Sequence, residues 1–122
     1  MMYEISVSGR FIAEHQLRLP GGGYESPHAH DWRVTVEIAG PNLDQNGLLI
    51  DFHEIKARLD ELLAIFYDRN LNRLPAFQHL PPSAENVARH IAEQMGGLLP
   101  EGARLKCVEV EEARGCIARF LP

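Results

Sequence analysis

HAHDWRVTVEIA, residues 28–39, is the part of the chain in which apolar and polar side chains alternate most regularly. Side chains point to opposite faces of a β-strand in turn, so this period of two predicts a strand. One face would carry, in order, His28, His30, Trp32, Val34, Val36 and Ile38. This face is apolar except at the histidines, which predicts that it is the inner face of a sheet. The turn residues of AGPNLDQNG, 39–47, end the strand.

The N-terminal segment has the same period. One of its faces would carry Tyr3, Ile5, Val7, Phe11, Ala13 and His15, interrupted only by Gly9. A glycine within a strand often marks a bulge, so the face on which His15 lies depends on the conformation at Gly9. The segment RLPGGGYESP, 18–27, contains three glycines and two prolines and predicts a turn or loop between the two strands.

Two helices are predicted after the second strand. The first begins at Asp51, with Glu54 three residues later as in a capping box, and extends to about Asp68. Its apolar positions recur at helical spacing, at Phe52, Ile55, Leu59, Leu62, Leu63 and Phe66. The second helix follows Ser83, a favourable N-cap residue, and Gly96 and Gly97 end it.

Two short strands complete the chain, over about 105–111 and 115–121. The order ββααββ predicts a single α+β domain over residues 1–122, with two helices on one face of a four-stranded antiparallel sheet. Such a sheet has two unpaired edges, and proteins usually pair or cover them. We therefore expect the chain to form a homo-oligomer.

The composition, 45% hydrophobic and 24% charged, is typical of a globular protein. A net charge of −5 argues against a general nucleic-acid binder, because phosphate contacts need a basic face. Two cysteines are too few for a disulfide scaffold, and no apolar run is long enough to cross a membrane. We expect a cytoplasmic protein with no nucleic-acid or membrane partner.

His28 and His30 are two residues apart on the predicted strand, so their imidazoles project from the same face. His15 at the end of the neighbouring strand would complete a set of three imidazoles, the ligand set of a catalytic zinc site with one open position. The alternative is a group of hydrogen-bonded histidines at a strand end. A cupin site is excluded, because it needs a carboxylate where Arg33 and Val34 stand.

Four further residues need an interpretation. Glu112 follows Val108 and Val110 on one face, so it is either a carboxylate that accepts two adjacent N–H donors of a ligand or a solvated residue beyond the strand. Trp32 continues an apolar face and is more simply part of the core than a surface on which a ligand stacks. Cys107 and Cys116 are interpreted as small hydrophobic residues of the sheet.

Six motifs together resemble the 6-pyruvoyltetrahydropterin synthase family, which includes 6-carboxytetrahydropterin synthase of queuosine biosynthesis. They occur in the order and spacing of that family: FIAEH (11–15), PHAHDW (27–32), GLLIDF (47–52), RNLN (69–72), PPSAEN (81–86) and VEVEE (108–112). The resemblance implies the tunnelling fold, whose subunits join their sheets into a barrel as trimers and stack the trimers into hexamers.

The resemblance also implies roles for individual residues. Zn²⁺ would be bound by His15, His28 and His30, with Ala29 in place of the glycine of the family's H-G-H motif. Glu112 would anchor the pterin ring, although Ala113 replaces the threonine that follows the anchoring glutamate in the family.

The catalytic residues depart from the family pattern. Tyr24 stands where many members have a cysteine, and Tyr67 and Asp68, or Asp68 and Arg69, stand where they have an aspartate and a histidine. A branch of the family has a glutamate in place of the cysteine and cleaves the side chain of dihydroneopterin, and Glu25 lies where that glutamate is expected. Asp68 remains a weaker candidate for orienting a proton-transfer group.

The sequence thus predicts a zinc-dependent pterin lyase acting on 7,8-dihydroneopterin or its triphosphate. Glu25 would be the acid/base, and the product would be 6-hydroxymethyl-dihydropterin. One alternative is a 6-carboxytetrahydropterin synthase of queuosine biosynthesis, and another is a non-catalytic, metal-containing pterin or purine binder. A subunit that acts only in assembly, without a small ligand, is a third.

Overall fold

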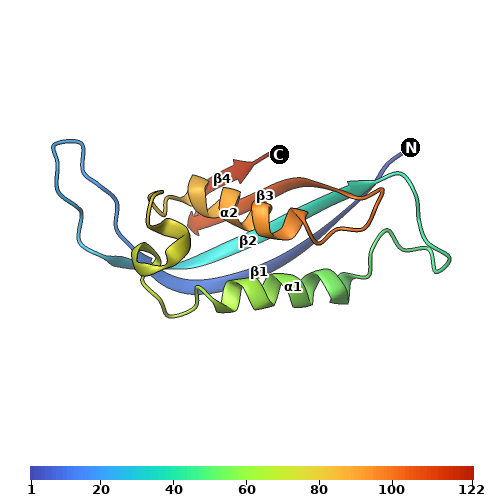
Figure 1. The fold of residues 1–122 in the computed structure, drawn as a ribbon, viewed down its shortest axis with the longest axis horizontal. Coiled ribbons are helices and arrows are strands. Elements are labelled where there is room, and N and C mark those ends of the chain that lie inside the picture. The colour runs from blue at the N-terminus through green and yellow to red at the C-terminus, as the bar shows by residue number, and fades with distance from the viewer.

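The computed structural model describes residues 1–122 and forms one antiparallel sheet with two helices against one of its faces (Figure 1). The sheet order is β1-β2-β3-β4, and every neighbouring pair is antiparallel. The elements are β1 Tyr3–His15, β2 His28–Gly40, α1 Phe52–Ala64, η1 Leu71–Arg73, η2 Pro75–Phe77, α2 Ala84–Gly96, β3 Arg104–Ala113 and β4 Cys116–Phe120. The predicted α+β fold is confirmed. The short 3₁₀ helices η1 and η2 were not predicted.

The pairing of β1 with β2 is continuous from Tyr3 opposite Gly40 to His15 opposite His28, so there is no bulge at Gly9. Gly9 instead serves the packing of α1 on the sheet, because a Cβ atom at this position would lie only 2.8 Å from the Cδ1 atom of Leu63 on α1. The missing side chain therefore lets α1 approach β1 closely. Since the register is unbroken, His15 lies on the inner face of the sheet.

The register shifts occur in β3 instead. One lies at Glu37 and Ile38 of β2 where they pair with β3, and the other lies between Glu111 and Ala113 where β3 pairs with β4. Glu112 is the additional residue at the second shift. Bulges often redirect a side chain beside a functional site, and the side chain of Glu112 points toward the end of the sheet that carries the histidines.

The first helix is shorter than predicted, because it ends at Ala64 rather than near Asp68. After it the chain turns through Asp68, whose φ of 59° lies in the left-handed region. This turn allows the Asp68 N–H to donate to the Ile12 carbonyl at 2.7 Å and the Glu14 N–H to donate to the Arg69 carbonyl at 2.9 Å. Residues 68–70 thus lie along the free edge of β1.

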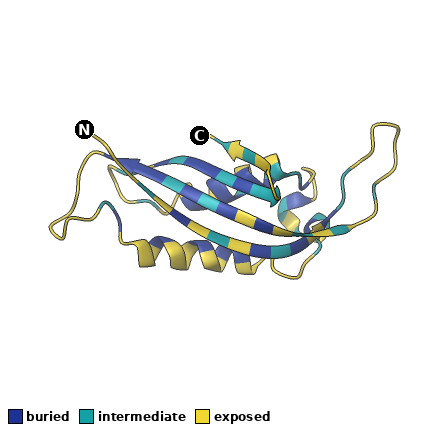
Figure 2. Cartoon of the chain, turned by 180° about the vertical axis from the view of Figure 1, so that it is seen from behind, coloured by how far each residue is buried: buried dark blue, intermediate teal, exposed yellow.

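The core lies between the sheet and the helices and includes 23 buried residues. Trp32 is 0% exposed, which confirms its assignment to the core and leaves no ring face for a ligand. Buried and exposed residues alternate along the strands (Figure 2). The other face of the sheet is polar and carries the ion pairs Arg10–Asp31, Lys106–Glu4 and Arg119–Glu109.

The two cysteines differ. Cys107 is buried, and burial raises the pKa of its thiol, as expected for a small core residue. Cys116 lies in the sheet, as predicted, but it is exposed at the start of β4 and does not pack as a hydrophobic residue. No helix of the structure is long and apolar enough to cross a membrane.

Candidate active site

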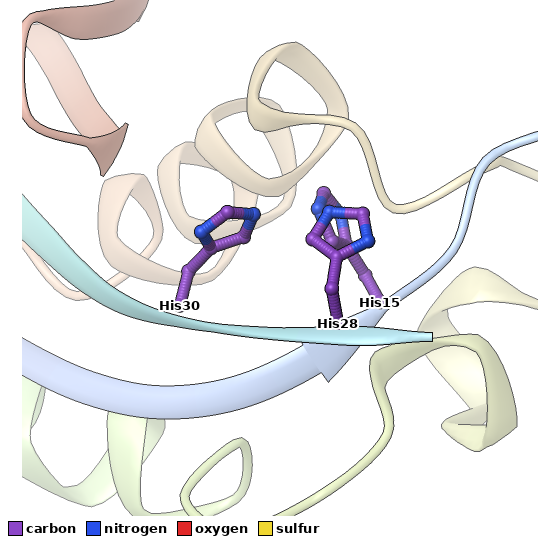
Figure 3. A group of neighbouring side chains, drawn as sticks. All are labelled: His15, His28 and His30. Carbon is purple, nitrogen blue, oxygen red and sulfur yellow. The ribbon is translucent and has the colours of Figure 1, made fainter. Parts of the chain in front are cut away.

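Three histidines meet at the end of the sheet where β1 finishes and β2 begins (Figure 3). Their ring centroids are 4.7 Å apart for His15 and His28, 4.6 Å for His28 and His30, and 5.3 Å for His15 and His30. One nitrogen atom of each ring lies within 4.8 Å of the others. The structure therefore brings together the three side chains that the alternation of β1 and β2 predicts on one face.

Backbone carbonyls orient two of these rings. The Nδ1 atom of His15 lies 2.8 Å from the Pro82 carbonyl oxygen, and that of His28 lies 3.2 Å from the Ser26 carbonyl oxygen. A carbonyl oxygen can only accept, so each Nδ1 carries a hydrogen, and Nε2 is the ring nitrogen that remains to face a ligand. Histidines that bind metals are commonly oriented in this way.

The Nε2 atoms of His15 and His30 are buried and have no hydrogen-bond partner. A carboxylate oxygen of Glu112 lies 3.0 Å from the His15 Nε2, but the contact is not aligned as a hydrogen bond. Buried polar atoms without partners are costly. Burial also lowers the pKa of His30, which favours its neutral form. Three imidazoles that each bring a nitrogen atom to one point form a donor set that fits a divalent transition metal.

Glu25 lies in the hairpin formed by residues 16–27, which projects beyond the sheet (Figure 1). Its Oε1 accepts a hydrogen bond from the Leu17 N–H at 3.0 Å, and its own N–H donates to the Leu17 carbonyl at 3.0 Å. The same Oε1 atom lies 3.7 Å from the His28 Nδ1. The carboxylate is therefore fixed beside the histidines rather than free in solvent.

Glu112 lies within β3, and its carboxylate touches His15 on the inner side of the sheet. The alternative of a solvated residue beyond the strand is thus wrong. Its side chain is 25% exposed and borders a cavity of about 280 Å³ between β4 and the start of α2. A carboxylate with one side open to a cavity next to the histidines is suited to accept N–H donors from a ligand.

The structure does not bring Asp68 into this group. Its side chain is exposed in the turn after α1 and makes no hydrogen bond or ion pair, while only its backbone N–H is used. Sequence reasoning missed Asn72, whose carboxamide contacts the chain directly after His15. Its place in the RNLN motif was noted, but no local pattern in the sequence indicates which backbone atoms its side chain meets.

Three histidines suited to bind a metal ion, with the carboxylates of Glu25 and Glu112 beside them, are typical of the active site of a metalloenzyme. Comparisons with known proteins identify the family. The family model described as 6-pyruvoyl tetrahydropterin synthase matches residues 4–122. An Archaeoglobus fulgidus protein provisionally named 6-carboxy-5,6,7,8-tetrahydropterin synthase is 31% identical over 109 residues, which cover 88% of this chain and 86% of that protein. The Dihydroneopterin monophosphate aldolase of Pyrococcus furiosus is 27% identical over 112 residues, covering 92% and 91%.

Two solved structures support the same fold. The Caenorhabditis elegans 6-pyruvoyl tetrahydropterin synthase has a TM-score of 0.86 at 20% identity, covering 100% of this chain and 96% of that one. A Plasmodium vivax 6-pyruvoyltetrahydropterin synthase, in which a catalytic glutamate is replaced by alanine, has a TM-score of 0.77 at 16% identity, covering 98% and 97%. The chain belongs to the 6-pyruvoyl tetrahydropterin synthase family. It is accordingly a lyase that processes pterins.

Proposed function

We propose that this chain cleaves the side chain of 7,8-dihydroneopterin, free or phosphorylated, with Zn²⁺ at the three histidines and Glu25 as the acid/base. The products are 6-hydroxymethyl-7,8-dihydropterin and glycolaldehyde or its phosphorylated form. The observation that carries the proposal is the position of the Glu25 carboxylate, which is hydrogen-bonded in the hairpin and lies 3.7 Å from His28.

Two relatives support this choice of reaction. The Pyrococcus furiosus protein acts, by its name, as an aldolase on dihydroneopterin monophosphate. The match covers 92% of the present chain. The Plasmodium vivax enzyme uses a catalytic glutamate. Glu25 offers the same type of group here, where Tyr24 leaves no cysteine in the same segment of the hairpin.

Cleavage breaks the bond between C1′ and C2′ of the substrate side chain. Glu25 takes the proton of the 2′-hydroxyl, C2′ leaves as the aldehyde carbon, and the electron pair of the broken bond enters the conjugated C6=N5 system of the ring. Glu25 then returns the proton to C1′, so the number of protons balances. Zn²⁺ held by the imidazoles would supply Lewis-acid polarisation of the side-chain hydroxyls.

Glu112 holds the pterin ring in this proposal. Its carboxylate accepts two adjacent N–H groups, one from the ring and one from the amino group, and such charge-assisted pairs are strong and directional. Its contact with His15 sets the ring next to the metal ligands. The reacting carbon atoms would then lie between Glu112 and Glu25.

We propose that the active form is a hexamer, a dimer of trimers in which the sheets join into a barrel. The support is the pair of sheet edges at β1 and β4, together with a polar sheet face that carries three ion pairs instead of an apolar surface. Sedimentation of the purified chain at micromolar concentration tests this, and a monomer would contradict it.

The second candidate function is that of a 6-carboxytetrahydropterin synthase in queuosine biosynthesis. The name of the Archaeoglobus fulgidus relative, at 31% identity, favours it. This chain lacks a cysteine in the hairpin, so another group would have to replace it. A third candidate, a pterin binder without activity, predicts bound pterin and no product.

Glu25→Gln tests the proposal. The substitution keeps an oxygen that can accept from the Leu17 N–H but removes the base, so we expect turnover to fall by about 10²- to 10⁴-fold. Zinc content and pterin binding, measured by metal analysis and fluorescence, should not change. Glu14→Gln, at an exposed residue of β1, is the matched control. Full turnover in Glu25→Gln would remove Glu25 from the mechanism.

A further inference from the structure

The carboxamide of Asn72 pairs with the backbone of Gln16 in both directions. The Gln16 N–H donates to the Asn72 Oδ1 at 2.9 Å, and the Asn72 Nδ2 donates to the Gln16 carbonyl at 2.9 Å. β1 ends at His15, so this side chain continues the hydrogen bonding of the strand edge by one residue. Both contacts are partly buried, which limits competition from water.

Asn72 is itself held in place. Its N–H donates at 3.0 Å to the Oδ1 of Asn70, the N-cap residue of η1, and the Gln78 Nε2 donates to its carbonyl at 3.2 Å. The segment that carries it is attached to the edge of β1 through the hydrogen bond from Glu14 to Arg69. A side chain fixed on one element can therefore fix the path of another.

The residues on either side of Gln16 belong to the candidate active site. His15 precedes it and is part of the histidine cluster. Leu17 follows it, and its N–H holds the Glu25 carboxylate at 3.0 Å. Gln16 is thus the joint between the sheet, which carries the histidines, and the hairpin, which carries Glu25.

We propose that Asn72 is a positioning residue that clamps this joint and so fixes the Glu25 carboxylate relative to the histidine cluster. This inference rests on the proposed acid/base role of Glu25. Beyond the pair of His15 and His28 that ends the sheet, the clamp is what holds Gln16, because neither backbone group of Gln16 makes another hydrogen bond. Small displacements of a catalytic group cost large factors in rate, about 10²-fold for 1 Å.

Asn72→Ala removes both hydrogen bonds to Gln16 and tests the proposal. We expect kcat to fall by about 10- to 100-fold. KM should stay within about threefold of the wild-type value, because the substitution does not touch the residues that bind the substrate in its ground state. Arg73→Ala is the matched control, since it truncates the exposed neighbour of Asn72 in η1, whose side chain makes no hydrogen bond, and leaves the Asn72–Gln16 pair intact. Asn72→Asp keeps the acceptor for the Gln16 N–H but places a carboxylate oxygen against the Gln16 carbonyl oxygen, so its kcat should be as low as that of Asn72→Ala.

A double-mutant cycle with Glu25→Gln separates positioning from a structural effect. If Asn72 acts through Glu25, Asn72→Ala lowers kcat by less than about twofold in the Glu25→Gln background. If Asn72→Ala still lowered kcat by about 10- to 100-fold in the Glu25→Gln background, Asn72 would act independently of Glu25, and the proposal would be overturned.

Hydrogen–deuterium exchange followed by mass spectrometry gives a readout that does not depend on activity. We expect faster exchange across residues 17–25 in Asn72→Ala and wild-type exchange in Arg73→Ala. Unchanged exchange across 17–25 in Asn72→Ala would show that Asn72 does not anchor the hairpin. A wild-type enzyme that yields no 6-hydroxymethyl product would refute the proposed function instead, and the exchange experiment would still test the clamp.

Discussion

The inner face of β2 has two regions that differ in chemistry although one alternation produces both. Trp32, Val34, Val36 and Ile38 are each 0% exposed and pack into the core. His28 and His30 continue the same face past the end of the core, where imidazole nitrogens replace methyl groups. One region stabilises the fold, and the other presents polar atoms that the protein itself does not satisfy.

The difference shows how two strands of the sheet can form a candidate metal site, because all three histidines lie on strands and none lies in a loop. The apolar region fixes the strand in register, and the register delivers His15, His28 and His30 to one point. Two buried nitrogen atoms without partners are the local cost of this arrangement. Burying apolar area elsewhere on the strand offsets that cost.

Substitutions in the two regions should change different properties, the free energy of unfolding in one region and the metal affinity in the other. These are the strongest effects that we expect. Ile38→Ala should lower the free energy of unfolding by about 2–5 kcal/mol and leave metal affinity unchanged. His30→Ala should lower metal affinity by roughly a hundredfold or more, because one of three ligands is lost. It should change the unfolding free energy of the metal-free protein little, since the removed nitrogen had no partner.

Urea unfolding of metal-free protein and competition with a chromophoric chelator measure the two quantities. If His30→Ala destabilised the metal-free chain as much as Ile38→Ala, the histidines would be part of the core. The comparison between the two regions would then fail.

Glu112→Gln should have the next largest effect. A hydrogen bond to a charged group contributes about 1.5–3 kcal/mol, so we expect the Kd of a pterin to rise by about 10- to 100-fold. Glu111→Gln is the control, because the Glu111 carboxylate lies on the other side of the strand and accepts from the Gly115 N–H. Fluorescence titration with pterin measures both. Equal Kd values for the two variants would remove Glu112 from the binding site.

The smallest expected effect concerns His90, whose ring lies 5.9 Å from that of Phe66 and 5.6 Å from that of Phe77. Burial lowers the pKa of His90 in the folded chain, so the unfolded chain binds the proton more readily. The stability is therefore complete above the ordinary histidine pKa of about 6.5 and falls as the pH drops below it.

His90→Gln should reduce this loss of stability. The Tm of metal-free protein, compared between pH 7.5 and pH 5.5, should decrease less in the variant than in the wild type. Burial lowers the pKa of His30 in the same direction, but both proteins contain it, so the difference reports His90. An identical decrease in Tm would show that His90 contributes nothing to the acid sensitivity.

Most elements of the fold and the positions of His28 and His30 could be predicted because they leave local signals in the sequence, whereas the face of His15 also depended on the conformation at Gly9. Alternation in β1 and β2 identifies the inner face, and His15, His28 and His30 share it. N-cap residues located both helices, since the Asp51 side chain accepts from the His53 N–H and that of Ser83 from the Asn86 N–H. These signals lie within a few residues of the feature that they predict.

Features that depend on contacts between distant segments could not be predicted. The packing of Leu63 against Gly9 explains why the glycine produces no bulge, and the attachment of residues 68–70 to β1 explains the early end of α1. The clamp of Asn72 on Gln16 joins residues 56 positions apart. None of these contacts leaves a periodic or local signal in the sequence.

The identity of the product decides whether the chain cleaves the side chain of dihydroneopterin with Glu25 as the acid/base. Zinc-loaded protein is incubated separately with 7,8-dihydroneopterin, its monophosphate and its triphosphate, and the pterins are separated by chromatography and identified by mass. The account predicts 6-hydroxymethyl-7,8-dihydropterin, formed together with glycolaldehyde or its phosphorylated form and abolished in Glu25→Gln. A 6-carboxy or 6-pyruvoyl product, or bound pterin that stays intact with zinc present, would contradict it.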